Sequence, residues 1–164
     1  IETARNVERA GASFLVLPCN TAHYFHKDVQ DAVGIPVLHM MEEVARSLKG
    51  KVELVGILAT SGTLKTGLYE KALSEAGIRS LVPSGEDQEK VMEAIYSVKA
   101  GKLQHGRELI LGQGRKLAHR GAQAVIAGCT EIPLILKQGD LDVEVVDATE
   151  ILAKACVRLA LEGM

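Results

Sequence analysis

The chain has 164 residues, and its 19 basic and 21 acidic side chains give a formal net charge of −2. This balance lacks the concentrated positive charge of a nucleic-acid or anionic-membrane binder, and 3% aromatic residues without tryptophan offer little surface for stacking on bases. No apolar run approaches the roughly 18–20 residues that span a bilayer. We therefore expect a globular protein without nucleic-acid or membrane partners.

The sequence contains three cysteines and no Cys-x-x-Cys pair. An odd count without a regular spacing argues against a disulfide framework and against a thioredoxin-like redox role. We expect reduced thiols and a cytoplasmic location.

Apolar runs alternate with amphipathic stretches along the whole chain. This alternation predicts an α/β fold built on a mostly parallel sheet. We expect strands over 14–17, 36–39, 52–60, 78–82, 122–128 and 143–146. We expect helices over 1–10, 21–32, 41–48, 61–77, 86–99 and 103–120, a short one after 130, and a last one over 147–163.

Two of the predicted strands end in a cysteine, Cys19 in VLPCNTAH and Cys129 in AVIAGCTE. Ligands of parallel sheets bind outside the carboxyl ends of strands. A thiol at a helix start has a lowered pKa and is more readily ionised. The alternative is a buried structural cysteine, a common environment for this residue. Because the two cysteines occur in matching contexts, a functional role is favoured over a structural one.

Two thiols that face one ligand suggest acid–base chemistry. One thiolate removes a proton from carbon and the other thiol delivers one to the opposite face, which inverts a stereocentre without a cofactor. A disulfide between the two cysteines is the competing use.

The segment 60–63 follows another strand and offers Thr60, Ser61 and Thr63 at a helix start. Their hydroxyls and the free backbone amides there suit an anion, although ordinary N-capping needs only one of them. Neither a P-loop nor a Gly-x-Gly-x-x-Gly motif is present, so nucleotide binding has no motif support.

Other polar residues lie beside these strand ends. Thr130 and Glu131 follow Cys129, and Glu131 is suited to orient an ammonium, tune the thiol or serve a helix first turn. Lys99 and Lys102 are candidates for a substrate carboxylate, or solvated lysines at a helix end. Cys19, His23 and His26 have some metal-ligand character, but no matching ligands follow and we expect no metal.

The stretches PCNTAH, ATSGTLKTGLY and GCTEIPL, in this order, resemble the aspartate/glutamate racemase superfamily. The resemblance implies two Rossmann-like domains with the substrate in the cleft between them, and catalysis without pyridoxal phosphate or metal. It implies Cys19 and Cys129 as the two bases. The residues it implies for substrate binding are Asn20, Thr21, Thr60, Thr63, Lys99, Thr130 and Glu131.

The resemblance also implies a domain division. Residues 1–48 with 148–164 would form the first α/β domain, and 49–147 the second. Members of the family begin with a strand and a glycine-rich loop that are not seen here, so we expect an incomplete first domain. The expected partner is an amino-acid substrate, aspartate or glutamate, and a homodimer is compatible with the family.

Three alternatives remain at this point. A hydantoin racemase would keep both cysteines and accept a cyclic substrate. A decarboxylase of the same superfamily needs one catalytic cysteine, which the presence of two disfavours. An inactive fragment would bind a ligand or partner without exchanging the α-proton.

Overall fold

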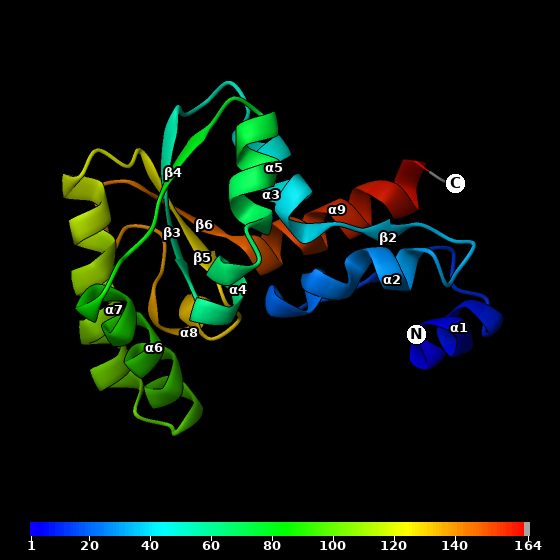
Figure 1. Ribbon diagram of the computed structural model, residues 1–164, viewed down its shortest axis with the longest axis horizontal. Coiled ribbons are helices and arrows are strands. Elements are labelled where there is room, and N and C mark those ends of the chain that lie inside the picture. The colour runs from blue at the N-terminus through cyan, green and yellow to red at the C-terminus, as the bar shows by residue number, and fades with distance from the viewer. Residues whose placement is uncertain (163–164) are drawn as a thin grey trace.

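The computed structural model describes residues 1–162 and consists of two parallel sheets with flanking helices (Figure 1). The last residue of the helix predicted over 147–163, and 163–164 of the predicted first domain, lie outside the described residues. The larger sheet has the strand order β4-β3-β5-β6. Its strands are β3 (Leu54–Ala59), β4 (Arg79–Leu81), β5 (Ala124–Gly128) and β6 (Glu144–Asp147). The α/β prediction is confirmed.

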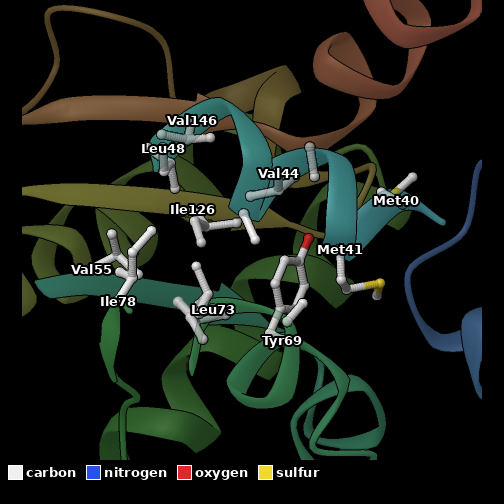
Figure 2. Close-up of a cluster of buried hydrophobic side chains, with 14 of the residues drawn as sticks. Met40, Met41, Val44, Leu48, Val55, Tyr69, Leu73, Ile78, Ile126 and Val146 are labelled. Atoms are coloured by element: carbon white, nitrogen blue, oxygen red, sulfur yellow. The ribbon is translucent and has the colours of Figure 1, made fainter. Parts of the chain in front are cut away.

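The larger sheet is covered on both faces, as expected for a parallel sheet. One face packs against α6 (Glu86–Lys99) and α7 (Leu103–His119). The other packs against α3 (Met40–Leu48) and α5 (Leu68–Glu75), where Figure 2 shows Tyr69 beside Met41. Gly56 allows α7 to approach the sheet closely, because a Cβ there would lie 2.9 Å from Leu117.

The smaller sheet pairs β1 (Leu15–Val16) with β2 (Val37–Leu38) in parallel. Helix α1 (Glu2–Arg9) precedes it and buries none of its residues. Helix α9 (Ala148–Glu162) leaves the larger sheet and runs beside α3 toward β2 (Figure 1). The division into residues 1–48 with 148–164 and 49–147 stays a prediction.

The prediction of a single helix over 21–32 is wrong. The segment forms a 3₁₀ helix, η1 (Thr21–Phe25), followed by the short α2 (His26–Gln30). Tertiary hydrogen bonds replace a longer helix: His26 Nε2 contacts the Val37 carbonyl at 2.7 Å, and the Gln30 amide bonds the backbone of Ile35 and Val37.

The helix predicted over 61–77 is also divided. It becomes α4 (Ser61–Lys65) and α5, separated by Gly67 at a φ of +67°. Only glycine adopts this left-handed conformation without strain, so the break is encoded locally. The short helix predicted after 130 is α8 (Ile132–Ile135). No helix in residues 1–162 is both long enough and apolar enough to cross a bilayer.

Candidate functional site

The order of the larger sheet selects one place for a ligand. The chain adds β4 on one side of β3 and then β5 and β6 on the other, so the strand order switches between the parallel neighbours β3 and β5. Such a switch point leaves a crevice outside the carboxyl ends of the two strands. Thr60 follows β3 and Cys129 follows β5 directly, and Ala59 lies opposite Gly128 in the register. Five of the predicted site residues therefore follow these two strand ends, namely Thr60, Thr63, Cys129, Thr130 and Glu131.

Cys19 lies three residues after β1 and its side chain is exposed. The expected α-helix after it is replaced by η1, so the α-helical N-terminus predicted for this thiol is absent. The backbone of Cys19 is held instead. Its carbonyl contacts Nδ1 of His23 at 2.9 Å, and its N–H donates to the Leu17 carbonyl.

His23 connects the Cys19 loop to α3. Its Nε2 accepts from the Met40 N–H at 3.1 Å, so Nδ1 carries the proton that is donated to Cys19. The ring is 1% exposed, and burial lowers its pKa. A neutral ring with both nitrogens bonded fixes the position of the backbone that carries the first thiol.

Asn20 is buried at 4% exposure, and the Tyr69 hydroxyl donates to its Oδ1 at 2.6 Å. Its Nδ2 has no hydrogen-bond partner within residues 1–162. Buried polar groups are nearly always paired, so these two N–H donors are available to a ligand. Asn20 was predicted as a binding residue, and this geometry suits that role.

Tyr69 was missing from the predicted site. Burial raises the pKa of its hydroxyl, and the negative charge of Asp147 adds to the effect. A Cβ on Gly128 would lie 3.2 Å from the Tyr69 ring, so the ring packs against the residue before Cys129. Tyr69 thus joins Asn20 to the end of β5. The sequence could have indicated this contact, because a buried tyrosine usually needs a hydrogen-bond partner for its hydroxyl.

The hydroxyl groups of three threonines lie within hydrogen-bond distance of one another, Thr21 from η1 and Thr60 and Thr63 from the start of α4. The Oγ1 atoms are 2.8 Å apart for Thr21 and Thr63, 2.9 Å for Thr60 and Thr63, and 3.2 Å for Thr21 and Thr60. The Thr63 N–H also donates to Thr60 Oγ1, which is the N-cap bond of α4. Thr60 is therefore the N-cap residue of α4 and also part of the hydroxyl cluster, while anion binding by this segment stays a prediction.

Cys129 is half-buried and its thiol donates to Glu131 Oε2 at 2.9 Å. Thr130 Oγ1 donates to the same oxygen at 3.1 Å, and Lys99 Nζ lies 3.4 Å from Oε1. These four predicted residues form one connected group. Lys102 does not join it, and instead lines a separate cavity with Tyr96.

Electrostatics distinguish this thiol from an ordinary one. Burial, and then the hydrogen bond to Glu131, raise the pKa of Cys129 to about 12. Burial acts to raise the pKa of Glu131 as well, but hydrogen bonds from Cys129 and Thr130 and the charge of Lys99 outweigh it and lower that pKa. At neutral pH Cys129 is therefore a protonated thiol beside an ionised carboxylate.

No group of three or more His, Cys, Asp or Glu side chains in residues 1–162 is arranged to hold a metal ion. His23 and His26, considered as metal ligands, instead stack at 5.9 Å between ring centroids, and His39 packs edge-on against both.

Comparison with known proteins gives a consistent answer. The Asp/Glu/Hydantoin racemase family model matches residues 1–156. The broad-specificity amino-acid racemase RacX of Bacillus subtilis is 27% identical over 158 residues, which is 96% of this chain and 69% of RacX.

Two solved structures are similar in fold as well as in sequence. The aspartate racemase homologue of Pyrococcus horikoshii is 36% identical with a TM-score of 0.86, covering 97% of this chain and 71% of that one. For the Picrophilus torridus aspartate racemase the identity is 28%, the TM-score 0.84, and the coverage 96% and 66%. The chain thus spans about two thirds of the length of these relatives and belongs to the Asp/Glu/hydantoin racemase family.

Proposed function

We propose that this chain carries the acid–base site of a cofactor-independent racemase for an acidic amino acid, aspartate or glutamate, with Cys19 and Cys129 as the two proton-transfer groups. One observation carries the proposal. The buried Tyr69–Asn20 hydrogen bond joins the residue after the first cysteine to a ring packed on the residue before the second. This link supports a common location for the two thiols, as a two-base reaction at a single carbon requires.

The α-carboxylate of the substrate has suitable donors. Asn20 Nδ2 is buried without a partner, and the hydroxyls of Thr21 and Thr63 lie in the adjoining cluster. Charge-assisted hydrogen bonds from neutral donors to a carboxylate are strong in a partly buried site. Binding there would also stabilise the negative charge that develops when the α-proton leaves.

The two thiols differ in a way that assigns their starting roles. Cys129 is protonated and bonded to Glu131, so it begins as the proton donor. Cys19 is exposed and begins as the base. Cys19 takes the α-proton, the C–H electron pair passes into the carbanion stabilised by the carboxylate, and Cys129 gives its thiol proton to the opposite face. The product is the mirror-image amino acid, with Cys19 protonated and Cys129 ionised.

Lys99 supports the choice of an acidic substrate, because its ammonium lies at the edge of the Cys129 group and is 3.4 Å from Glu131. The Picrophilus torridus aspartate racemase and the Pyrococcus horikoshii aspartate racemase homologue support the same choice, whereas RacX is a racemase of broad specificity. A hydantoin racemase is the second candidate within the family. We expect the enzyme to act in the cytoplasm, where thiols stay reduced, and a homodimer stays a prediction.

Deuterium exchange at the α-carbon tests the proposal. The 164-residue chain is incubated in D2O with L- or D-aspartate, L- or D-glutamate, or a cyclic hydantoin, and NMR follows loss of the α-proton signal. We expect exchange with an acidic amino acid, and we expect Cys19→Ser and Cys129→Ser each to stop racemisation. Cys156→Ser, in α9 and outside the site, is the matched control and should retain the rate.

The outcomes separate the alternatives. Racemisation at the parent rate by either site variant would overturn the two-thiol mechanism. Exchange with the hydantoin alone would favour the second candidate. A chain that binds aspartate but exchanges no α-proton would support the ligand-binding alternative instead.

A further inference from the structure

A basic cavity of about 310 Å³ lies between α3 and α9, lined by side chains that the proposed chemistry does not use. Arg46, Lys49 and Lys51 come from the end of α3 and the turn after it, and Lys154 and Arg158 come from α9. In a chain of net charge −2, five of the 19 basic residues therefore surround one cavity.

A buried carboxylate organises the two arginines of this cavity. Glu43 is 5% exposed, and it accepts from Arg46 Nη1 at 2.6 Å and from Arg158 Nη2 at 2.8 Å. Each guanidinium has five N–H donors in a rigid fork, so one bond to Glu43 fixes its position and leaves other donors free for a ligand. Glu43 thus holds two guanidinium groups, one from each helix, at the edge of one cavity.

The local charge is not neutralised by neighbouring residues. Lys154 pairs with Glu150 at 2.6 Å, while neither Lys49 nor Lys51 has a carboxylate within 4.0 Å in residues 1–162. The negative charge of Glu162 also acts on Arg158. Five cations thus face three carboxylates, Glu43, Glu150 and Glu162, which leaves a local excess of two positive charges. Such a concave, single-sign surface attracts anions.

Helix electrostatics explain only part of this pattern. Cations near the carboxyl end of α3 offset the helix dipole, which accounts for Arg46 and Lys49. Lys154 and Arg158 lie one turn apart in the interior of α9, and Lys51 lies beyond α3. These three have no dipole to offset, and all five converge on the cavity.

We propose that this cavity is a second ligand site, distinct from the cysteine site, which binds a phosphate-bearing small anion between the Arg46–Glu43–Arg158 bridge and Lys49 and Lys51. Paired guanidinium groups suit the oxygens of a phosphate, and the two unpaired ammonium groups supply further charge. The ligand carries two or more negative charges, as a diphosphate or a phosphate monoester does.

Binding is measured by titrating the ¹⁵N-labelled chain with sodium pyrophosphate, and separately with AMP, at constant ionic strength. We expect saturable shifts confined to the amides of 46–51 and 151–158. In Lys49→Gln/Lys51→Gln, binding should weaken by at least about tenfold because two charge-assisted contacts are lost. These exposed lysines are not part of the Glu43 bridge, so the variant keeps the fold, which its unfolding midpoint will verify.

A matched control separates a site from general attraction. Lys65→Gln/Lys137→Gln removes two exposed lysines that do not line the cavity, and its affinity should change less than about twofold. Equal affinity in both double variants, or shifts that grow linearly and spread over other lysines, would overturn the proposal. Saturable binding of pyrophosphate alone identifies a diphosphate ligand, whereas comparable binding of AMP identifies a phosphate monoester. The readout is independent of racemisation.

Discussion

The two parallel sheets are stabilised in different ways. In the larger sheet every residue of β5, and all but the first of β3, is buried, and apolar clusters cover both faces. In the smaller sheet β1 and β2 have two residues each, and only Val37 is buried. The segments around the smaller sheet are held together by hydrogen bonds from the side chains of Gln30, His23 and His26 to backbone carbonyls.

This difference bears on the two cysteines. Cys129 extends a strand whose position is fixed by packing on both faces, whereas Cys19 follows a short strand and depends on polar contacts for its position. Packing resists displacement, while partly exposed hydrogen bonds open at a low free-energy cost. We therefore expect the Cys19 side of the site to be the adjustable one.

A pair of matched truncations gives the largest test of this contrast. Val125→Ala removes fully buried atoms from β5 and should lower the free energy of unfolding by about 2–3 kcal/mol. Val16→Ala removes half-buried atoms from β1 and should cost about 1 kcal/mol. Urea unfolding measures both. Equal losses would show that the smaller sheet is as dependent on packing as the larger one.

The contact that joins the two sheets should have the next largest effect. Tyr69→Phe keeps the ring but leaves the buried Asn20 Oδ1 without its donor, which should cost about 1–3 kcal/mol. Tyr96→Phe is the control, since Tyr96 is 61% exposed and should change stability by less than about 0.5 kcal/mol. If Tyr69→Phe left the free energy of unfolding in urea unchanged, Asn20 would be positioned by other contacts.

The same contrast explains what the sequence predicted well. Continuous apolar runs such as AVIAG identify strands of the larger sheet and place Cys129 at a strand end, because burial on both faces leaves a clear pattern. Thr130, Glu131 and Lys99 are connected to Cys129 by hydrogen bonds or an ion pair, while their role in substrate binding stays a prediction.

The smaller sheet was less predictable for a physical reason. The break of the 21–32 helix depends on hydrogen bonds of His26 and Gln30 with residues around β2, and no local pattern encodes such contacts. Tyr69 was missed because its partner Asn20 is 49 positions away. Gly67, by contrast, was a local signal for the break between α4 and α5.

A pH dependence should arise from the histidine cluster beside the smaller sheet. Burial, and then the nearby charges of His26, His23 and Lys71, lower the pKa of His39 from 6.5 to about 4. The unfolded chain therefore binds more protons than the folded one between these values, so stability falls as the pH drops from 6.5 through 4.

His39→Asn removes this titration and keeps an acceptor for the Glu42 N–H at the start of α3. Between pH 7 and 4.5 the free energy of unfolding should fall in both proteins. After discounting for solvent screening, the fall should be about 1–2 kcal/mol smaller in the variant than in the parent. Urea midpoints at the two pH values measure this difference. Parallel losses in both proteins would assign the acid sensitivity to other groups, His23 first among them because burial also lowers its pKa.

The smallest effect is expected at α1, which has no buried residue and makes two polar contacts with the segment 32–34. Glu8 Oε1 accepts from the Gly34 N–H at 2.7 Å, and Arg5 Nε donates to the Ala32 carbonyl at 3.2 Å. Glu8→Ala should speed amide exchange in 2–9 while changing global stability by less than about 0.5 kcal/mol, because the contact is exposed. Glu8→Gln keeps the acceptor and should exchange like the parent. If Glu8→Ala instead lowered the global stability by as much as Val125→Ala, α1 would belong to the cooperative core, and the division between a packed sheet and a polar-bonded one would not hold.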